Sequence, residues 1–300
     1  MASLDDHGRA QGALLGLAIG DALGAPLEFS DPADAMLVVQ SGLDMTGGGI
    51  WEPGEWTDDT AMALTLAESI GKRGLLDLDD LARRYAAWAA SGPKDIGITT
   101  RVALSRVTSA DDARANARLL HEQTSRTAGN GTVMRAAPIT FAARSGSAAD
   151  AAARADATLT HYDPAAGDAS ASLCIALRAL MEDDDPLAWA MRAASDARTQ
   201  EALSEVGDEN AIGARAGGPE FGVAWTALAV GLHALTEFED FEAGIAFAIS
   251  LGGDTDTNGA VAGALLGARS GPAGIPERWL ARLKDRERIE DAAAGLLRFE

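Results

Sequence analysis

The chain has 300 residues, of which 47% are hydrophobic and 23% charged, a composition typical of globular proteins that excludes a disordered chain. Its formal net charge is −20 at pH 7, and this excess of negative charge repels phosphate backbones and anionic lipids. We therefore expect no binding to nucleic acid and none to a membrane surface.

Cys174 is the only cysteine, so an internal disulfide is excluded, and the simplest setting is a reducing, cytoplasmic one. The apolar stretch 14–29 follows acidic rather than basic residues, and Asp21 and Glu28 interrupt it. It therefore fails as a signal peptide or a membrane span, and we expect a buried element there.

Helices are predicted along the whole chain, because alanine-rich segments repeat apolar residues at spacings of three and four. These segments are 10–22, 60–71, 78–90, 110–120, 148–159, 168–181, 186–195, 221–236, 240–250 and 258–268. Only residues 36–40 hint at the alternation of a strand. The expected fold class is all-α, in one large domain or two tightly fused ones.

Loops are predicted where glycine and proline gather between these helices, and functional residues are expected on them. The predicted loops are 42–55, 91–97, 126–138, 160–167, 205–220 and 251–257. The stretch 205–220, with its charges and its glycines, is predicted to be a long and mobile connector.

The same pentamer, Gly-Ala-Leu-Leu-Gly, occurs at 12–16 and again at 263–267. Small residues let two helix backbones approach closely. We expect these two segments to lie in central helices that pack in the core.

Two short segments carry an unusual density of threonine and aspartate, each directly before a predicted helix. The first is 56–60 and the second is 252–258. Such side chains cap helices by accepting hydrogen bonds from free backbone N–H groups, which is one reading of both segments. A cap uses one residue, however, whereas each segment supplies two carboxylates and at least two threonine hydroxyls.

If the two segments meet, Asp58, Asp59, Asp254 and Asp256 share one small volume and repel one another unless protons or cations intervene. Ligands that are all oxygen atoms favour Mg²⁺, Mn²⁺ or Ca²⁺ over zinc. With hydroxyls from the neighbouring threonines, four carboxylates could hold two ions. Spacing alone does not separate such a metal site from plain helix capping.

Six segments together resemble the ADP-ribosylglycohydrolases, the family that includes the dinitrogenase reductase-activating glycohydrolase. They are GALLGLAIGDALG at 12–24 with Glu28, WTDDT at 56–60, DIG at 95–97, GNGTVMRAAP at 129–138, TH at 160–161 and LGGDTDT at 251–257. They occur in the family's order and extend over nearly the whole chain. Each is weak alone, but the set is specific.

The resemblance implies one compact, orthogonal, all-helical bundle over residues 1–300. The substrate that it implies is ADP-ribose attached to a protein side chain. It implies a hydrolase that cuts the glycosidic bond of that linkage. It also implies two divalent cations, Mg²⁺ or Mn²⁺, with six metal ligands: Thr57, Asp58, Asp59, Asp254, Asp256 and Thr257.

Two catalytic residues follow from the same resemblance. Glu28 matches the family's catalytic glutamate, so we expect it to activate water or to contact metal; otherwise it is a solvent-facing glutamate at a helix end. Asp95 matches an aspartate that handles the proton of a leaving guanidinium, which makes ADP-ribosyl-arginine the first expected substrate. The alternative role for Asp95 is to cap the helix that follows.

The resemblance also places substrate-binding residues along an ADP-ribose cleft: Gly129, Asn130, Gly131, Thr132, Met134 and His161. Glycines at 129 and 131 leave backbone N–H groups open to a diphosphate. Relatives often have glycine where Thr132 stands. Arg135 is expected to pair with a carboxylate of the chain rather than with phosphate.

Relatives stack adenine on an aromatic residue at the position of Val223, which leaves Phe221 or Trp225 as substitutes. Other readings of the whole chain are a hydrolase for ADP-ribosyl-serine or another O-linked conjugate, a dinuclear phosphohydrolase, and a module that binds ADP-ribose without turnover. The expected partner is an ADP-ribosylated protein or conjugate, and the expected oligomeric state is a monomer.

Overall fold

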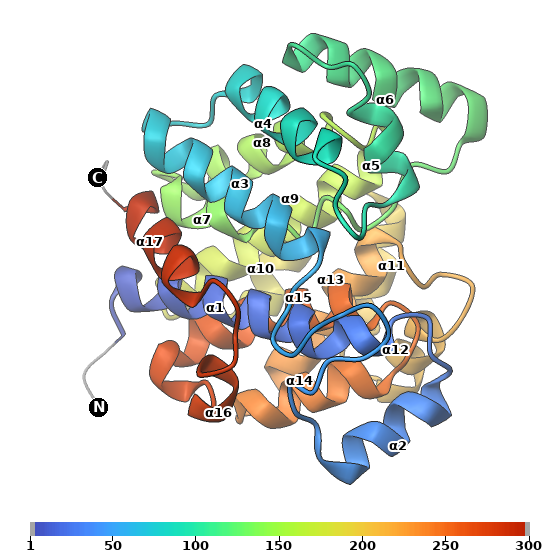
Figure 1. Ribbon diagram of the computed structural model, residues 1–300, viewed down its shortest axis with the longest axis vertical. Helices are drawn as coiled ribbons and strands as arrows, with labels where there is room; N and C mark the ends of the chain where they lie inside the picture. Colours follow the sequence, from blue (N-terminus) through green and yellow to red (C-terminus); the bar gives the residue numbers. More distant parts are fainter. Residues whose placement is uncertain (1–3, 298–300) are drawn as a thin grey trace.

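The two copies of the repeated pentamer lie on two helices that run side by side through the middle of the molecule. The computed structural model, which describes residues 4–297, places the first copy on α1 (Asp6–Gly24) and the second on α15 (Thr255–Ser270) (Figure 1). The expectation that these segments form central, packed helices is therefore confirmed.

Glycines spaced four residues apart allow α1 and α15 to touch backbone to backbone. A methyl group added to Gly12, Gly16 or Gly20 would stand 2.1 Å or less from a backbone carbonyl oxygen of α15. The facing residues of α15 are, in the same order, Gly267, Gly263 and Gly259, so the two helices are antiparallel. This pairing brings the last residue of α1, Gly24, against the first turn of α15.

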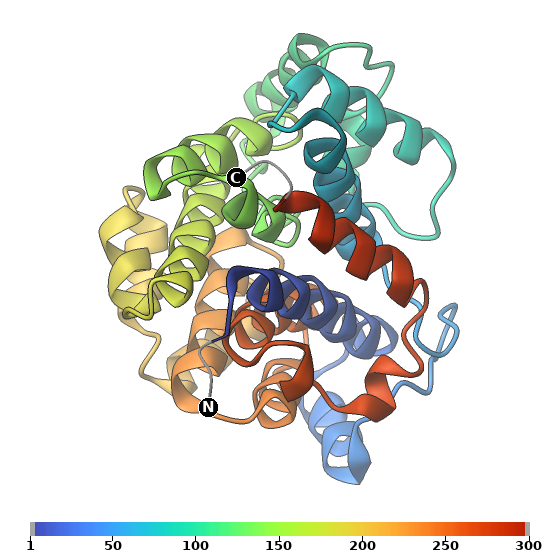
Figure 2. The ribbon, with the colours of Figure 1, turned by 90° about the vertical axis from the view of Figure 1, so that its left-hand side faces the viewer.

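The other helices surround this pair. Figure 1 shows α3, α4, α5 and α6 together at one end of the molecule, and Figure 2 shows α17 alongside α1. The elements are η1 (Ala25–Leu27), α2 (Pro32–Gly42), α3 (Asp58–Arg73), α4 (Leu78–Ala90), α5 (Ile98–Ala103), α6 (Ala110–Thr124), α7 (Ala137–Ala142), α8 (Gly146–Ala157), α9 (Pro164–Met181), α10 (Pro186–Ala193), α11 (Ala197–Ser204), α12 (Glu209–Ala216), α13 (Ala224–Glu237), α14 (Phe241–Ser250), η2 (Pro272–Gly274), α16 (Glu277–Leu280) and α17 (Arg286–Leu296).

The all-α prediction is confirmed, since residues 4–297 contain no strand beyond isolated bridges. All ten predicted helices are present. Their buried apolar side chains join in one continuous core cluster. Three predicted loops are shorter than expected, because α7, α9 and α15 begin inside them.

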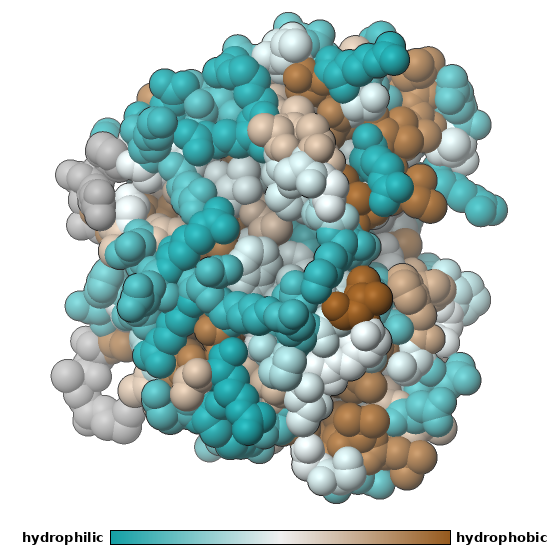
Figure 3. Space-filling view, in the orientation of Figure 1, coloured by the Kyte–Doolittle hydropathy of each residue, from teal (hydrophilic) through white to brown (hydrophobic). Residues whose placement is uncertain are grey.

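Two sequence predictions were wrong. The strand hint at 36–40 lies within α2, which begins with Pro32 at its first position and buries only Ala35. Its apolar side chains face outward, with Leu37 64% exposed, and they form the brown patch over α2 in Figure 3. The predicted mobile connector 205–220 contains α12, whose Ile212 and Ala216 are buried.

Much of the aspartate in this acidic chain starts helices. At ten helices the side chain of the residue before the first turn accepts a hydrogen bond from a free backbone N–H group, which satisfies a donor that the helix itself leaves unpaired. These residues are Asp5, Thr57, Asp77, Ser109, Ser145, Asp163, Asp185, Asp196, Asp208 and Asp240.

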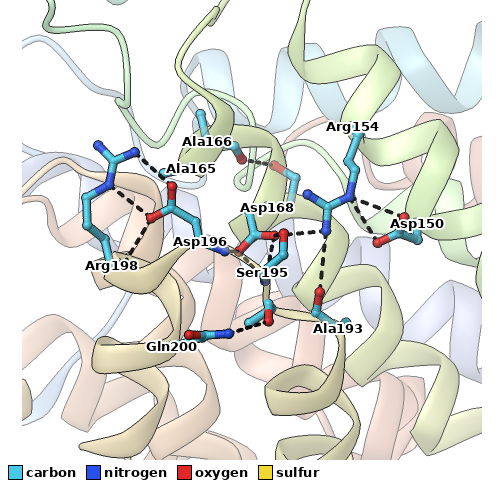
Figure 4. Close-up of polar contacts among 12 residues, drawn as sticks. Asp150, Arg154, Ala165, Ala166, Asp168, Ala193, Ser195, Asp196, Arg198 and Gln200 are labelled. Carbon is cyan, nitrogen blue, oxygen red and sulfur yellow. Dashed lines mark hydrogen bonds and ion pairs between the residues drawn. The ribbon is translucent and has the colours of Figure 1, made fainter.

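Buried Asp168 on α9 ties three neighbouring segments together (Figure 4). Its carboxylate accepts hydrogen bonds from the backbone N–H and the hydroxyl of Ser195 and from the backbone N–H of Asp196. Arg154 of α8 forms an ion pair with it at 2.8 Å. The network fixes α8 and the start of α11 against α9.

The stretch Asp6–Leu27 is long and apolar enough to cross a membrane by length and composition alone. Most of it is inside the molecule, however, with 83% of the most apolar window buried. The expectation of a buried element at this position is therefore confirmed.

We predict that Gly16→Ala lowers the free energy of unfolding by about 3 kcal/mol, because the new methyl group would collide with the carbonyl of Gly263 and force the helices apart. Urea denaturation measures the change. The matched control is Gly213→Ala in α12, where the nearest atom would lie 3.9 Å away. That variant should be as stable as the parent or up to about 1 kcal/mol more stable, and equal losses in both variants would contradict the packing argument.

Candidate active site

A cavity of about 370 Å³ opens where α1 ends and where α3, α5 and α15 begin. Its volume is within the range of small-molecule binding sites. Six carboxylate side chains line it: Glu28, Asp58, Asp59, Asp95, Asp254 and Asp256. The two Thr/Asp segments therefore meet, although nearly two hundred residues separate them in the chain.

Buried Asp21 fixes the start of α3. Its carboxylate accepts hydrogen bonds from the backbone N–H of Thr57 at 2.9 Å and of Thr60 at 3.0 Å, and from the Thr60 hydroxyl at 2.5 Å. From the sequence, Asp21 was expected to organise the turn before Glu28. The structure shows that it holds the first turn of α3, which carries Asp58 and Asp59, against α1.

Helix capping accounts for one residue of the first acidic segment and for none of the second. Thr57 is a true cap, since its hydroxyl accepts from the backbone N–H of Asp59 at 3.3 Å. Asp254 precedes α15 in the capping position, but its side chain accepts no hydrogen bond from that helix. It instead accepts from the side-chain amide of Asn130 at 2.9 Å and lines the cavity. Asp254 is thus held for a purpose other than capping.

The two acidic segments are also joined directly. The hydroxyl of Thr257 donates to Asp59 Oδ1 at 3.4 Å, and the backbone N–H of Thr257 donates to Asp256 Oδ1 at 2.9 Å. Asp58 Oδ2 accepts from the backbone N–H of Gly97 at 3.3 Å, which connects α3 to the start of α5.

Glu28 is half-buried in the cavity rather than facing solvent. The residue after it, Phe29, has φ 64°, a left-handed backbone conformation that is uncommon for a residue with a side chain. Backbone hydrogen bonds hold this turn against the second acidic segment, from Phe29 to Gly253 at 2.7 Å and from Gly253 to Ser30 at 3.0 Å.

Asp95 does not cap α5, because the residue in the capping position is Gly97 and no side chain caps that helix. One carboxylate oxygen from each of Glu28, Asp95 and Asp256 lies within 4.8 Å of the other two. This group of potential metal ligands includes both proposed catalytic residues, of which only Glu28 was expected to contact metal, as an alternative to activating water.

Burial and mutual repulsion make it costly for these groups to be charged together. Burial, followed by the nearby carboxylates, raises the pKa of Glu28 to about 8 and that of Asp58 to about 7. The same two causes raise the pKa of Asp59 and of Asp256 well above the ordinary value.

The donor set fits divalent cations. Asp59 Oδ2 is buried and has no hydrogen-bond partner, and no lysine or arginine is among the described residues that line the cavity. A cation would supply the missing partner for that oxygen and relieve the repulsion. Hard oxygen ligands of this kind suit Mg²⁺ or Mn²⁺.

Another part of the cavity wall comes from the segment 129–134. Gly129 pairs with Val223 in an isolated bridge, and the backbone N–H of Asn130 donates to Gly222 at 3.1 Å. A side chain on Gly131 would stand 2.8 Å from the ring of His161, so this position needs glycine for space.

His161 is buried at the cavity wall and uncharged at neutral pH. Burial, and then the charge of Arg135, lower its pKa to about 3. Its Nδ1 is within hydrogen-bonding distance of the Thr160 hydroxyl at 2.8 Å. Arg135 itself is paired with Asp156 at 2.9 Å, so the prediction that it pairs with a carboxylate is confirmed.

Most of the residues expected at the site line the cavity, but two do not. Thr57 and Thr132 are both buried behind the wall, and the Thr132 hydroxyl donates to the backbone of Ala166. Asn130 lines the cavity, but its side-chain amide donates a hydrogen bond to Asp254.

Of the aromatic residues considered for adenine, Trp225 is buried with Arg198 over its ring, whereas Phe221 is 45% exposed. Phe221 packs edge-on against exposed Phe29, which lines the cavity. The sequence analysis missed Phe29, as well as Ile98 and Gly222, which also line the cavity. The sequence could have identified two of these residues by position, because Phe29 directly follows Glu28 and Ile98 closely follows Asp95.

Comparisons with known proteins identify the family of the chain. The family model described as ADP-ribosylglycohydrolase matches residues 2–299. The chain belongs to the ADP-ribosylglycohydrolase family. It is 34% identical over 293 residues to the ADP-ribosyl-[dinitrogen reductase] glycohydrolase of Rhodospirillum rubrum, an alignment that covers 92% of this chain and 90% of that protein.

Two further relatives of this ADP-ribosylglycohydrolase family member are similar over most of its length. The ADP-ribosylarginine hydrolase Tri1 of Serratia proteamaculans is 32% identical, with 96% of this chain and 78% of that protein covered. A solved structure named ADP-ribosylglycohydrolase-related protein complex is 35% identical, with a TM-score of 0.79 and coverage of 98% and 99% of the two chains.

We predict that the protein without cations becomes less stable as the pH rises from about 5 to about 8. The folded state holds the protons of Glu28 and Asp58 more tightly than the unfolded chain, whose carboxyl groups have pKa values near 4. Stability therefore falls over the pH range in which the unfolded chain has released these protons and the folded state still holds them. The melting temperature in chelator should drop by several degrees over this range, and Mg²⁺ or Mn²⁺ should restore it at pH 8. Glu28→Gln should flatten the dependence, and an unchanged slope in that variant would contradict the assignment.

Proposed function

We propose that this family member hydrolyses the glycosidic bond between ADP-ribose and an arginine side chain of a modified protein. The observation that carries the proposal is the convergence of Glu28 and Asp95 with the carboxylates of both acidic segments in one cavity. The similarity to the ADP-ribosylarginine hydrolases of Serratia proteamaculans and Pseudomonas putida supports arginine as the linkage.

We further propose that two Mg²⁺ or Mn²⁺ ions belong to this site. The residues that would hold them are Asp58, Asp59, Asp254, Asp256 and Thr257, with Thr57 behind them and Glu28 and Asp95 beside Asp256. When bound, the ions would neutralise these carboxylates and attract the hydroxyl oxygens of the substrate's ribose. The unpartnered oxygen of Asp59 supports this part of the proposal.

Glu28 is the group best suited to take a proton from the attacking water. General acid–base catalysis works best when the pKa of the group lies near the working pH, and burial brings the pKa of Glu28 to about 8. The turn at Phe29, tied to Gly253, keeps the carboxyl group directed into the cavity. Glu28 would therefore bind and orient water, accept its proton and return to its starting state after release of that proton.

Asp95 is suited to the leaving group. A guanidine leaves poorly unless its protonated form is stabilised, and a carboxylate beside it can hold the positive charge and orient the N–H groups. Asp95 is half-buried, lines the cavity and lies on the connection before α5, where we place the arginine end of the substrate. The surrounding carboxylates also stabilise the positive charge that develops on the sugar in the transition state.

The remaining wall would receive the diphosphate and the adenosine. Backbone around Gly129 and Gly131 faces the cavity. Neutral His161 can donate a hydrogen bond to a phosphate oxygen without contributing charge. The exposed rings of Phe29 and Phe221 form an apolar edge suited to a base.

The test is a panel of defined peptides carrying ADP-ribose on arginine or on serine, assayed with Mg²⁺ or Mn²⁺ added back after chelation. We expect free ADP-ribose and an unmodified arginine peptide as products, and no turnover in chelator. Release of AMP or inorganic phosphate would instead identify a phosphohydrolase. Preferred cleavage of the serine peptide would overturn the arginine assignment, and binding without cleavage of any peptide would identify a binding module.

We predict that Asp254→Ala and Asp58→Ala each lower the metal-dependent rate at least about a hundredfold, because each removes a carboxylate from the cation site. Glu28→Gln should lower kcat by about a hundredfold or more while ADP-ribose still binds, since the amide keeps the shape but cannot accept a proton. Single-turnover kinetics measures the rate of cleavage, and calorimetry measures the binding of ADP-ribose.

The matched control for these variants is Asp34→Ala, which removes an exposed carboxylate on α2 outside the cavity. It should leave the rate unchanged. An unaltered rate in Asp254→Ala or Asp58→Ala would exclude the proposed cation site, whereas unfolding of Glu28→Gln would reveal a structural role for that residue.

A further inference from the structure

A second cavity, of about 600 Å³, lies between α4, α5 and the segment 104–108, at the end of the molecule that holds α3 to α6 (Figure 1). Among the described residues it shares no lining residue with the carboxylate-rich cavity. Its apolar wall consists of alanines of α4 together with Leu104 and Val107. Three arginines line it as well, Arg83 from α4, Arg101 from α5 and Arg106 from the segment between α5 and α6. We call this the arginine cavity.

The three guanidinium groups have no partner within the part of the chain that the structure describes. None of them takes part in an ion pair or in a side-chain hydrogen bond. Arg84, the neighbour of Arg83 in the chain, is by contrast paired with Asp80 at 2.5 Å. All three side chains are exposed and remain unpaired although the chain has 45 acidic and only 25 basic residues.

No carboxylate is among the described residues that line the arginine cavity. The acidic side chains nearby are engaged elsewhere: Asp80 with Arg73 and Arg84, Asp79 with the backbone of Ala110, and Asp112 with Thr108 and Ser109. The positive charge of this cavity is therefore not balanced by the protein, and an anion is the natural complement.

The wall that carries two of the arginines is held in place without a ligand. The side-chain amide of Asn116 on α6 donates to the backbone carbonyls of Ala103 and Ser105, both at 3.0 Å. Arg106 itself has φ 56°, a left-handed backbone conformation that few residues other than glycine adopt. The cavity is thus formed in advance, which lowers the entropy cost of binding.

We propose that the arginine cavity is an accessory binding site for a nucleotide-sized phosphate ester. The planar guanidinium group matches the geometry of phosphate oxygens and can bind two of them at once. The alanines, Leu104 and Val107 offer an apolar surface for a base or another ring. The volume is within the range of small-ligand sites, and the net charge of −20 opposes a polyanion such as nucleic acid.

The test measures binding of AMP, inorganic phosphate and adenosine to the full chain with Mg²⁺ present, by calorimetry. Arg83→Gln and Arg101→Gln should each weaken AMP binding about tenfold or more, since each removes one charged hydrogen-bonding group. Phosphate and adenosine should each bind more weakly than AMP, because each meets only half of the cavity. AMP binding should also weaken as salt is raised.

Arg126→Gln is the matched control, because Arg126 is also exposed and free of an ion pair but lies outside the cavity. It should leave AMP binding unchanged, and all three variants should keep the parent's melting temperature. An AMP affinity that is the same in the parent, Arg83→Gln and Arg101→Gln would overturn the proposal, as would equal weakening by Arg126→Gln. Equal affinities for phosphate and AMP would overturn the assignment to a nucleotide-sized ligand.

Discussion

The backbone contact between α1 and α15 is the constraint on which the site depends. Glycines at every fourth position let the two helices approach until carbonyl oxygens of one helix occupy the space of the missing side chains of the other. Because the helices are antiparallel, the end of α1 meets the start of α15, and the Thr255 hydroxyl donates to the carbonyl of Gly24 at 2.9 Å. Glu28 follows within a few residues and so lies beside Asp256. A wider helix spacing would separate Glu28 from the acidic segment that contains Asp256.

The same contact creates an electrostatic conflict that the fold alone does not resolve. Six carboxylates line one cavity, and buried Asp21 lies behind them with its own pKa raised to about 6, mainly by burial. Backbone N–H groups and threonine hydroxyls satisfy several of these oxygens, but one oxygen of Asp59 has no partner. Groups arranged at such a cost to stability are typical of functional sites, where a bound ion recovers the free energy that the empty arrangement loses.

The long helices could be predicted from the sequence, because each buries an apolar face and shows spacings of three and four. The helix α2 could not, since its apolar residues are exposed and only Ala35 is buried. The helix α17 was missed although its buried residues 289, 292, 293 and 296 keep helical spacing, because charged residues dominate its first half. The density of threonine and aspartate identified the two acidic segments. It could not show that Asp254 leaves its helix uncapped, or that Asp95 joins Glu28, because both depend on contacts between distant parts of the chain.

The carboxylate-rich cavity and the arginine cavity carry charges of opposite sign. The carboxylate-rich cavity is lined by no described lysine or arginine, and Arg135, behind its wall, is buried against Asp156 and donates to the carbonyl of Gly131. An anionic diphosphate therefore finds no side-chain cation there, and its attraction to the cavity has to come from bound ions and backbone N–H groups. If cations occupy this cavity as we propose, substrate binding would depend on them as much as the chemistry does, because the carboxylates alone would repel the diphosphate.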